Sequence, residues 1–156
     1  MLKALISDFS GVILKPVDGN YTGGLNTLNN ELSAEGDYDF WKYFKLNEEL
    51  LEFYKTIKGK IDVYVFTTGH IQEHPELRPH LEGIFKEVFS SERLGLNKKD
   101  NNAYQAIVEK VGLKPNEILY IDDKQENIDK ANSLGITTIL YLSNKQAIKD
   151  ITKSMI

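Results

Sequence analysis

The sequence predicts an α/β doubly wound, Rossmann-like domain: three layers, with a parallel sheet, helices on both faces and a reduced cap insertion. Two observations lead to this fold class. Short apolar segments rich in β-branched and aromatic residues recur along the chain, and amphipathic helical segments separate them. Short apolar runs bounded by turn signals are typical of strands buried on both faces, as in a parallel sheet. Their alternation with helices over short links predicts right-handed crossovers.

Five segments have the strand pattern and four have the helical pattern. The strands are expected at Lys3–Asp8, Ile61–Thr67, Lys86–Ser90, Glu117–Asp122 and Thr137–Leu142. The helices are expected at Asn47–Lys58, Glu76–Phe85, Asn102–Val111 and Gln125–Leu134. Asn47 is a suitable N-cap for the first helix, and Gly135 is suited to the left-handed position just after the last one.

The stretch Lys15–Phe44 does not fit the alternation of strands and helices. It is rich in Gly and Asn and ends in five aromatic residues: Tyr38, Phe40, Trp41, Tyr43 and Phe44. We expect residues 1–156 to form a single domain with a small cap or flap inserted at about residues 15–45. The aromatic cluster is expected to form the core or hinge of this insertion rather than a substrate platform.

Composition excludes several functional classes. The chain has 156 residues, 41% of them hydrophobic and 27% charged, and it has no cysteine. A disulfide scaffold, a cysteine-ligated metal and a thiol nucleophile are therefore excluded, and a cytoplasmic location is expected. The 19 basic and 23 acidic residues give a net charge of −4 without a basic stripe, which argues against nucleic acid and membrane as partners. The apolar amino-terminal run is too short to span a bilayer, and it lacks the pattern of a signal peptide.

Polar residues follow the predicted strands at the points where they end. Asp8 ends the first strand, Thr67 ends the second, Asp122 and Asp123 end the fourth, and Lys98 lies in the loop before a helix. Ligands bind at the carboxyl ends of parallel strands, so these side chains are expected to converge. Crowded carboxylates need a cation among them, and hard oxygen ligands suit Mg²⁺. Lysine, a hydroxyl and Mg²⁺ are what phosphoryl transfer requires, and a remaining carboxylate can be the nucleophile.

Four motifs in this set resemble those of the haloacid dehalogenase (HAD) superfamily of phosphohydrolases, and they occur in the family's order. The runs are DFSGVI at 8–13, FTTG at 66–69, FSSERLGLNK at 89–98 and IDD at 121–123, the last followed by Asn127, Ala131 and Gly135. Together they cover nearly the whole chain except the insertion. The resemblance implies a Mg²⁺-dependent hydrolase that acts on a phosphorylated small molecule or macromolecule.

The resemblance also implies a role for each matching residue. Asp8 is expected to attack phosphorus and to bind Mg²⁺. Thr67 and Lys98 are expected to hold the phosphoryl oxygens, and Asp123 with Asp122 is expected to complete the metal site. Thr68 next to Thr67 and His70 at the rim of the crevice are further candidates for substrate binding, and Ser10 is expected to offer its backbone carbonyl to the metal.

Ser10 is the departure from the family's pattern that matters most for the chemistry. In the family's phosphatases, the residue two positions after the nucleophile is a second Asp that protonates the leaving group and then activates water. A hydroxyl cannot do this near neutral pH, whereas a positioned carboxyl contributes ~10²–10⁴-fold. Slow turnover or a long-lived aspartyl-phosphate is expected. We also consider the hypothesis that His70 takes over the proton transfer, because its titration range suits this role.

Two functions remain open from the sequence alone. The first is a phosphohydrolase acting through Asp8, and the second is a phosphate-binding or interaction domain that kept the fold but lost the acid–base group. The first is favoured because the full residue set is present. Dehalogenation is disfavoured, since it needs no Mg²⁺ and leaves the paired acids unexplained. A small cap leaves the crevice open, which suits either a macromolecular phospho-substrate or a homo-oligomer whose second subunit covers the site.

Overall fold

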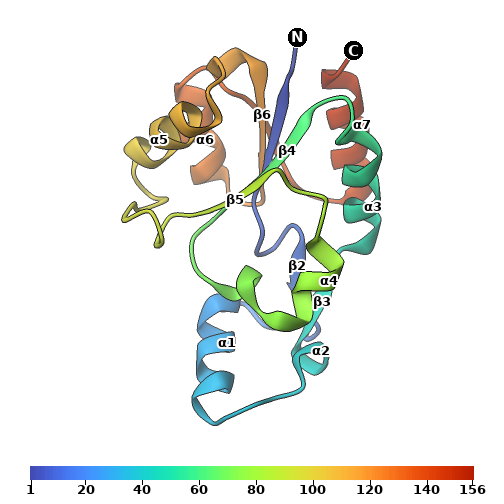
Figure 1. The fold of residues 1–156 in the computed structure, drawn as a ribbon, viewed down its shortest axis with the longest axis vertical. Coiled ribbons are helices and arrows are strands. Elements are labelled where there is room, and N and C mark those ends of the chain that lie inside the picture. The colour runs from blue at the N-terminus through green and yellow to red at the C-terminus, as the bar shows by residue number, and fades with distance from the viewer.

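The computed structural model describes residues 1–156 and is built around a five-stranded parallel sheet with the strand order β5-β4-β1-β6-β7 (Figure 1). The strands are β1 (Ala4–Ser7), β4 (Asp62–Thr67), β5 (Glu87–Ser90), β6 (Ile118–Asp122) and β7 (Thr137–Leu140). All four pairings between neighbouring strands are parallel. The predicted fold class is confirmed, and each strand lies within a segment predicted from its apolar run.

Successive residues of a strand point to opposite sides of the sheet, so both faces of this sheet carry apolar side chains. Helices cover each of the two faces. On one face the side chains of Leu5, Val63 and Leu119 belong to the same buried cluster as those of two helices, α3 and α7. On the other face Tyr64 and Tyr120 belong to a cluster shared with α5 and α6. Figure 1 shows the two helix pairs on opposite sides of the strands. Their bounds are α3 (Glu48–Ile57), α5 (Asn101–Val111), α6 (Gln125–Ser133) and α7 (Asn144–Ser154).

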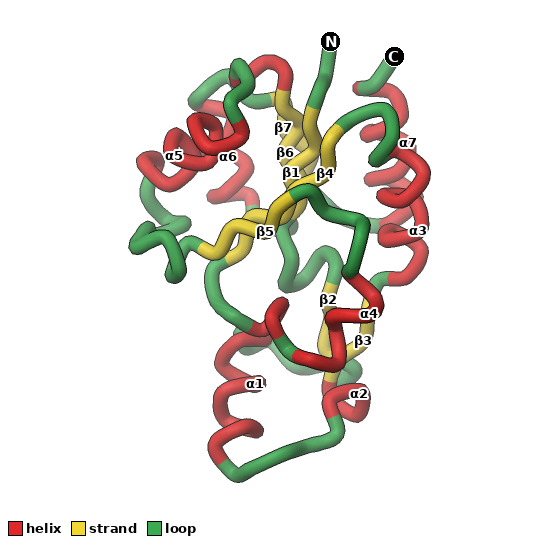
Figure 2. The backbone as a smooth tube through the Cα atoms, in the orientation of Figure 1, coloured by secondary structure: helices red, strands yellow, loops and turns green.

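An antiparallel hairpin leaves the main body directly after β1. Its strands are β2 (Leu14–Pro16) and β3 (Phe44–Leu46), and the chain between them forms α1 (Leu25–Ala34) and the one-turn helix α2 (Phe40–Tyr43). We call residues 14–46 the flap. Figure 2 shows the flap beyond the carboxyl ends of the parallel strands, which is where the polar residues of the strand ends lie.

The aromatic cluster is the core of the flap. Phe40 and Phe44 are each only 1% exposed, and their ring centroids lie 4.8 Å apart. This confirms the expectation from the sequence. The cluster also reaches beyond the flap: Phe40 stacks on the ring of His74 at 4.2 Å between centroids, and Trp41 Nε1 donates to Glu76 at 3.0 Å. The flap is therefore packed on the segment that follows β4.

Three of the four predicted helices are confirmed, and the prediction for Glu76–Phe85 is wrong. The segment Glu76–Phe85 instead forms one turn of α-helix, α4 (Arg78–Leu81), preceded by two 3₁₀ turns at Ile71–Glu73 (η1) and Pro75–Leu77 (η2). Pro75 and Pro79 lack backbone N–H donors, and Gly83 has a left-handed φ of 77°, so a continuous helix cannot form here.

The carboxyl-terminal helix α7 was not predicted, although the sequence carries a signal for it. The Ser143 hydroxyl accepts from Gln146 N, and the Gln146 side chain accepts from Ser143 N, which is a capping box. A further short 3₁₀ turn, η3 (Pro115–Glu117), precedes β6. None of the helices combines the length and the apolar character that crossing a membrane requires.

Asn47 joins three parts of the fold at one buried point. Its Nδ2 donates to Val12 O at 2.9 Å and to Asn144 Oδ1 at 2.8 Å, and its Oδ1 accepts from Asn144 Nδ2 at 2.7 Å. Its backbone N–H donates to Ile13 O at 2.7 Å, and its side chain caps α3. The loop after β1 and the first turns of α3 and α7 are thereby held together.

Replacing Asn47 with Ala is expected to lower the free energy of unfolding by about 2–3 kcal/mol, because several buried polar groups lose their partner at once. Urea unfolding followed by circular dichroism measures this loss. The control is Asn30→Ala, an exposed position on α1. An Asn47→Ala chain as stable as the control would contradict the role assigned to Asn47.

Candidate active site

The three central strands bring their end residues to one edge of the sheet. Ser7 pairs with Val65 of β4 on one side and with Ile121 of β6 on the other. Asp8 and Asp122 come next on their two strands and therefore lie side by side. The Asp8 backbone N–H continues the ladder by donating to Ile121 O at 2.9 Å. Parallel pairing in this register is what places the two carboxylates at one end of the sheet.

Lys98 reaches this edge from the loop before α5 and is buried there. Its Nζ lies 2.7 Å from Asp8 Oδ1 and 3.0 Å from Asp122 Oδ2, and it donates to the Phe66 carbonyl at 3.0 Å. Burial disfavours the ammonium, but the two carboxylates outweigh burial, so the pKa of Lys98 lies above its ordinary value. A permanent positive charge is therefore held between two acids.

Asp8 is the least stabilised of the charged groups in the site. Burial raises the pKa of its carboxyl to about 7, and the neighbouring Asp122 and Asp123 act in the same direction, while Lys98 opposes them. The side chain lines a cavity, so a ligand that enters the cavity can reach it. An acid that one lysine only partly neutralises favours the arrival of a second cation.

Asp122 is fixed in orientation by three hydrogen bonds. Its Oδ2 accepts from Tyr120 Oη at 2.5 Å and from Asn127 Nδ2 at 3.1 Å, and its Oδ1 accepts from Lys124 N at 2.9 Å. Burial acts to raise the pKa of this carboxyl, but Lys98 and these hydrogen bonds bring it below its usual value. Asp122 is therefore an oriented anion.

Asp123 completes a cluster of three carboxylates. One oxygen from each of Asp8, Asp122 and Asp123 lies within 4.8 Å of the others. Asp123 is exposed, and partial desolvation of its carboxyl by neighbouring groups, reinforced by Asp122, raises its pKa. Gly11 allows this arrangement: it has a φ of 87°, and a Cβ there would lie 2.3 Å from Asp123 Oδ2. Only glycine lets the turn after Asp8 pass this close to Asp123.

A cavity of about 320 Å³ opens on Asp8. Thr67 and Thr68 from the end of β4 line it together with Lys98, and the first turn of α1 forms part of its wall. Thr67 is buried, and its backbone carbonyl accepts from Ser91 N at 2.8 Å, which holds the strand end against the next loop. The structure thus gathers Asp8, Thr67, Thr68 and Lys98 around one cavity, as the sequence predicts.

Ser10 also lines this cavity, two residues after Asp8. Its hydroxyl is buried and has no hydrogen-bond partner within the chain. A polar atom left in this way is unfavourable unless a ligand satisfies it. The position at which the sequence analysis expects a departure from the family's pattern therefore lines the cavity.

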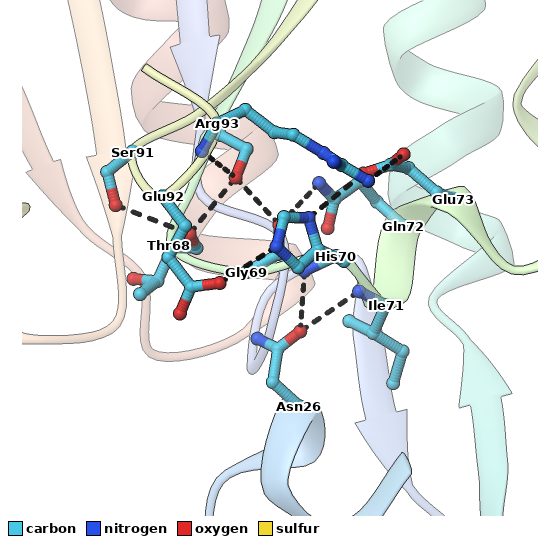
Figure 3. A network of polar contacts seen from close by, with 11 residues as sticks. Asn26, Thr68, Gly69, His70, Ile71, Gln72, Glu73, Ser91, Glu92 and Arg93 are labelled. Atoms are coloured by element: carbon cyan, nitrogen blue, oxygen red, sulfur yellow. Dashed lines mark hydrogen bonds and ion pairs between the residues drawn. The ribbon is translucent and has the colours of Figure 1, made fainter. Parts of the chain in front are cut away.

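His70 lies beside the cavity but does not line it. Its Nδ1 is 3.1 Å from Glu73 Oε2 and its Nε2 is 3.0 Å from Glu92 Oε2, so both ring nitrogens are engaged (Figure 3). Arg93 also pairs with Glu73, at 3.0 Å. The structure does not bring the His70 ring together with Asp8.

A larger depression of about 810 Å³ lies elsewhere, along β5 and α4. Phe85 and Val88 contribute apolar surface there, and Arg78 and Glu87 contribute charge. None of the three clustered carboxylates, Thr67 or Lys98 reaches it. The smaller cavity is therefore the candidate active site, because Asp8, Thr67 and Lys98 line it.

The sequence matches the family described as haloacid dehalogenase-like hydrolase over residues 24–135, which is more than half of the chain. The chain belongs to this family. The resemblance inferred from the four motifs is thereby confirmed, and the protein is a HAD-like hydrolase. The matched region begins after Asp8 and Ser10, so the family match does not include these two residues.

Curated relatives of this HAD-like hydrolase are longer proteins. The chain is 31% identical over 120 residues to bifunctional epoxide hydrolase 2 of Sus scrofa, which covers 70% of this chain and 21% of that protein. It is 32% identical over 108 residues to enolase-phosphatase E1 of Shewanella frigidimarina, covering 64% of this chain and 47% of the relative. The chain therefore spans between a fifth and about half of these relatives.

Solved HAD structures share the fold across nearly the whole chain. A HAD family enzyme from Bacteroides thetaiotaomicron, in complex with magnesium and inorganic phosphate, superposes with a TM-score of 0.71 at 15% identity, covering 92% of this chain and 96% of that one. A predicted HAD-like family hydrolase from Porphyromonas gingivalis also gives a TM-score of 0.71, at 16% identity, covering 98% and 97%. At this identity the likeness establishes the fold.

Two residues that orient Asp122 were missed as site residues by the sequence analysis. Tyr120 stands two positions before Asp122, so the strand periodicity alone places both side chains on one face of β6. Asn127 belongs to the fourth motif, and its position on α6 brings it back to the strand end. A third missed residue, Asn26, lines the cavity from the flap, and nothing in its local sequence indicates this.

Proposed function

We propose that this HAD-like hydrolase is a Mg²⁺-dependent phosphate monoester hydrolase in which Asp8 is the nucleophile. The observation that carries the proposal is the set of three carboxylates within 4.8 Å of one another, with Lys98 Nζ at 2.7 Å from Asp8. Phosphoryl transfer depends on positioned charge around a nucleophile, and this site supplies both.

The donor set fits a magnesium ion. Three carboxylates face a single ammonium group, that of Lys98, so the cluster carries excess negative charge. Carboxylate oxygens are the ligands that Mg²⁺ prefers. Burial raises the pKa of Asp8 despite Lys98, and Asp122 and Asp123 act in the same direction, so a second cation is favoured there. We infer that Asp8, Asp122 and Asp123 hold the ion, with the Ser10 carbonyl as a further ligand. When bound, Mg²⁺ supplies charge neutralisation for the incoming phosphate.

The residues of the chain then divide the reaction between them. Thr67, Thr68 and Lys98 hold phosphoryl oxygens, and Lys98 offsets the repulsion between the phosphate and Asp8. A carboxylate oxygen of Asp8 attacks phosphorus while the bond to the leaving-group oxygen breaks. The leaving alkoxide takes a proton from water. A second water molecule then attacks phosphorus, which releases inorganic phosphate and restores the carboxylate of Asp8.

Ser10 determines where this reaction is slow. Its hydroxyl cannot protonate an alkoxide near neutral pH, so esters with poor leaving groups are expected to react slowly. Because residue 10 has no carboxyl to activate water, the attack of water on the phosphorylated Asp8 is expected to be slow as well. The competing function, a phosphate-binding domain without turnover, rests on this one residue.

Steady-state hydrolysis of p-nitrophenyl phosphate tests the proposal, since p-nitrophenolate leaves without needing an acid. Turnover is expected with Mg²⁺ and is expected to be lost when EDTA removes the metal. Restoration by excess Mg²⁺ shows that the loss is reversible. No turnover above the rate without protein would contradict the phosphohydrolase and favour the binding domain.

Replacing Ser10 with Asp is expected to raise kcat for an alkyl phosphate ester by about 10²-fold, because a positioned carboxyl then protonates the leaving group. The gain for p-nitrophenyl phosphate is expected to be smaller in the step that releases p-nitrophenolate. The release of p-nitrophenolate in the first turnover isolates this step, and steady-state rates on both substrates measure the overall gain.

His70→Ala is the companion variant. Both ring nitrogens of His70 face glutamates, so we expect this change to alter kcat less than about twofold. A large loss of turnover in His70→Ala, together with no gain in Ser10→Asp, would assign the proton transfer to His70 instead.

A further inference from the structure

Asn26 ties the flap to the loop that follows β4. Its Oδ1 accepts from the backbone N–H groups of His70 at 3.0 Å and of Ile71 at 2.9 Å (Figure 3). These donors begin the 3₁₀ turn η1, whose N-cap residue His70 makes no side-chain cap of its own. Asn26 therefore caps η1 from a distant part of the chain, and in doing so it anchors α1.

The approach of Asn26 to this loop depends on Gly69. A Cβ at Gly69 would lie 2.5 Å from Asn26 Oδ1 and 2.6 Å from its Cγ. The stacking of Phe40 on His74 attaches the flap to the same segment at a second point. With two attachments, the flap wall of the cavity is in place before a substrate binds, which reduces the entropy lost on binding.

The hydrogen bonds of Asn26 also fix which way its amide points. Only the carboxamide oxygen can accept from two N–H donors, so Nδ2 must lie on the opposite side. Figure 3 shows this nitrogen turned toward the side on which Thr68 and Glu92 lie, and both of these residues line the cavity. Two N–H donors of Asn26 are thereby left for a ligand.

Most of the residues around Asn26 carry polar side chains. Of the 14 residues that line the cavity, only Leu25 is hydrophobic. Thr27 lies beside Asn26 on the first turn of α1, and Lys99 and Lys124 lie at other points of the lining. Pockets that accept aromatic or acyl groups are lined mainly by apolar side chains. Around a group bound in this cavity, hydrogen-bonding side chains therefore outnumber apolar side chains.

We propose that Asn26 and Thr27 form the leaving-group subsite, and that the substrate is a small hydroxylated alkyl phosphate, that is, a polyol phosphate. This inference rests on the phosphohydrolase proposed above and specifies its substrate class. Asn26 Nδ2 donates to a hydroxyl oxygen of the leaving group, and the Thr27 hydroxyl pairs with another. The cavity volume of about 320 Å³ is at the small end of the range of ligand pockets, which suits a small substrate.

A matched pair of esters tests the substrate class. Glycerol 3-phosphate and n-propyl phosphate have the same carbon chain and differ by two hydroxyl groups. Their inhibition constants against Mg²⁺-dependent hydrolysis of p-nitrophenyl phosphate are measured, so neither ester needs to be turned over quickly. The unmodified chain is expected to bind glycerol 3-phosphate on the order of tenfold more tightly, the effect of one or two hydrogen bonds.

Three variants assign this preference to residues. Asn26→Asp keeps the acceptor for His70 and Ile71 but removes the amide donor, and Thr27→Val removes the hydroxyl with little change of shape. Both are expected to retain the melting temperature, and each is expected to reduce the preference to about threefold, because one of the two hydrogen bonds remains. The new charge in Asn26→Asp weakens both esters together, so it does not change their ratio. Asn30→Asp, exposed on the same helix, is the charge-matched control.

Equal inhibition constants in the unmodified chain would overturn the inference while leaving the phosphohydrolase intact. A tenfold preference that persists in both Asn26→Asp and Thr27→Val would place the leaving-group contacts elsewhere and also overturn it. An absence of any p-nitrophenyl phosphate turnover would refute the proposed function, and the substrate class would fall with it.

Discussion

Asp8→Asn is expected to lower kcat for p-nitrophenyl phosphate by at least about 10³-fold, as removal of an essential nucleophile does in other enzymes. The amide has nearly the shape of the carboxylate but no anionic oxygen to attack phosphorus. Every other group that holds the phosphate remains, so the affinity for inorganic phosphate is expected to change much less than kcat. Initial rates and phosphate inhibition constants separate the two effects.

The same variant is expected to remain folded. The folded chain holds the Asp8 proton up to about pH 7, whereas an unfolded chain releases it near pH 3.8. The unfolding free energy of the metal-free protein therefore falls as pH rises between these two values. A neutral amide avoids this loss, so Asp8→Asn is expected to melt at the same or a higher temperature at pH 8 in EDTA. Asp37→Asn, on the exposed part of the flap, is the matched control, and an equal loss of kcat in both variants would contradict the assignment.

Lys98→Met is expected to cause the largest loss of stability of any single change in the site. Lys98 is 6% exposed and is paired with Asp8 and Asp122, which are 6% and 0% exposed. Removing one partner of a buried ion pair costs roughly 3–5 kcal/mol, because the remaining charges are left without compensation. For a chain of this size that is a decrease of about 10 °C in melting temperature.

Magnesium gives this variant an internal control. A divalent cation among Asp8, Asp122 and Asp123 replaces part of the missing positive charge, so Mg²⁺ is expected to raise the melting temperature of Lys98→Met more than that of the unmodified chain. Lys99→Met, at the adjacent exposed position, is expected to melt within about 2 °C of the unmodified chain. If Lys98→Met and Lys99→Met have the same melting temperature in EDTA, Lys98 does not balance the buried charges of Asp8 and Asp122.

The sheet could be predicted because its strands are buried on both faces. Burial of this kind makes each strand a continuous apolar run, and the residue that ends the run marks the edge of the sheet. Asp8, Thr67 and Asp122 were placed in the site by this rule. Lys98 was not, since a lysine in a loop has no pattern of its own, and only the order of the family's motifs indicated it.

Residues whose roles depend on distant partners were out of reach of the sequence. Asn26 caps a turn that lies 44 and 45 positions further along the chain, so no spacing rule can find it. The prediction of a helix over 76–85 was wrong although the local pattern was present. The apolar residues have helical spacing, but Pro79 and the turn at Gly83 prevent the backbone from forming a continuous helix. Capping chemistry at Ser143 indicated α7 and was not used.

The small flap also changes the view of the substrate. From the sequence, a reduced cap left the crevice open and favoured a macromolecular substrate or a covering subunit. In the structure, Asn26 and the Phe40–His74 stack hold the flap on the segment after β4, and a cavity lies beneath it. This geometry favours a small substrate, and the possibility of a covering subunit stays an untested prediction.

The central claim, that Asp8 carries the phosphoryl group during turnover, is tested most directly by mass spectrometry of the chain quenched in acid during the first turnovers of p-nitrophenyl phosphate with Mg²⁺. Because Ser10 cannot activate water, the second step is expected to be the slower one, and the phosphorylated chain is expected to accumulate. We expect one phosphoryl group per chain, located on Asp8, and none when EDTA has removed Mg²⁺ before the reaction. Sustained turnover with Asp8 unmodified, or with the phosphoryl group on another residue, would contradict it.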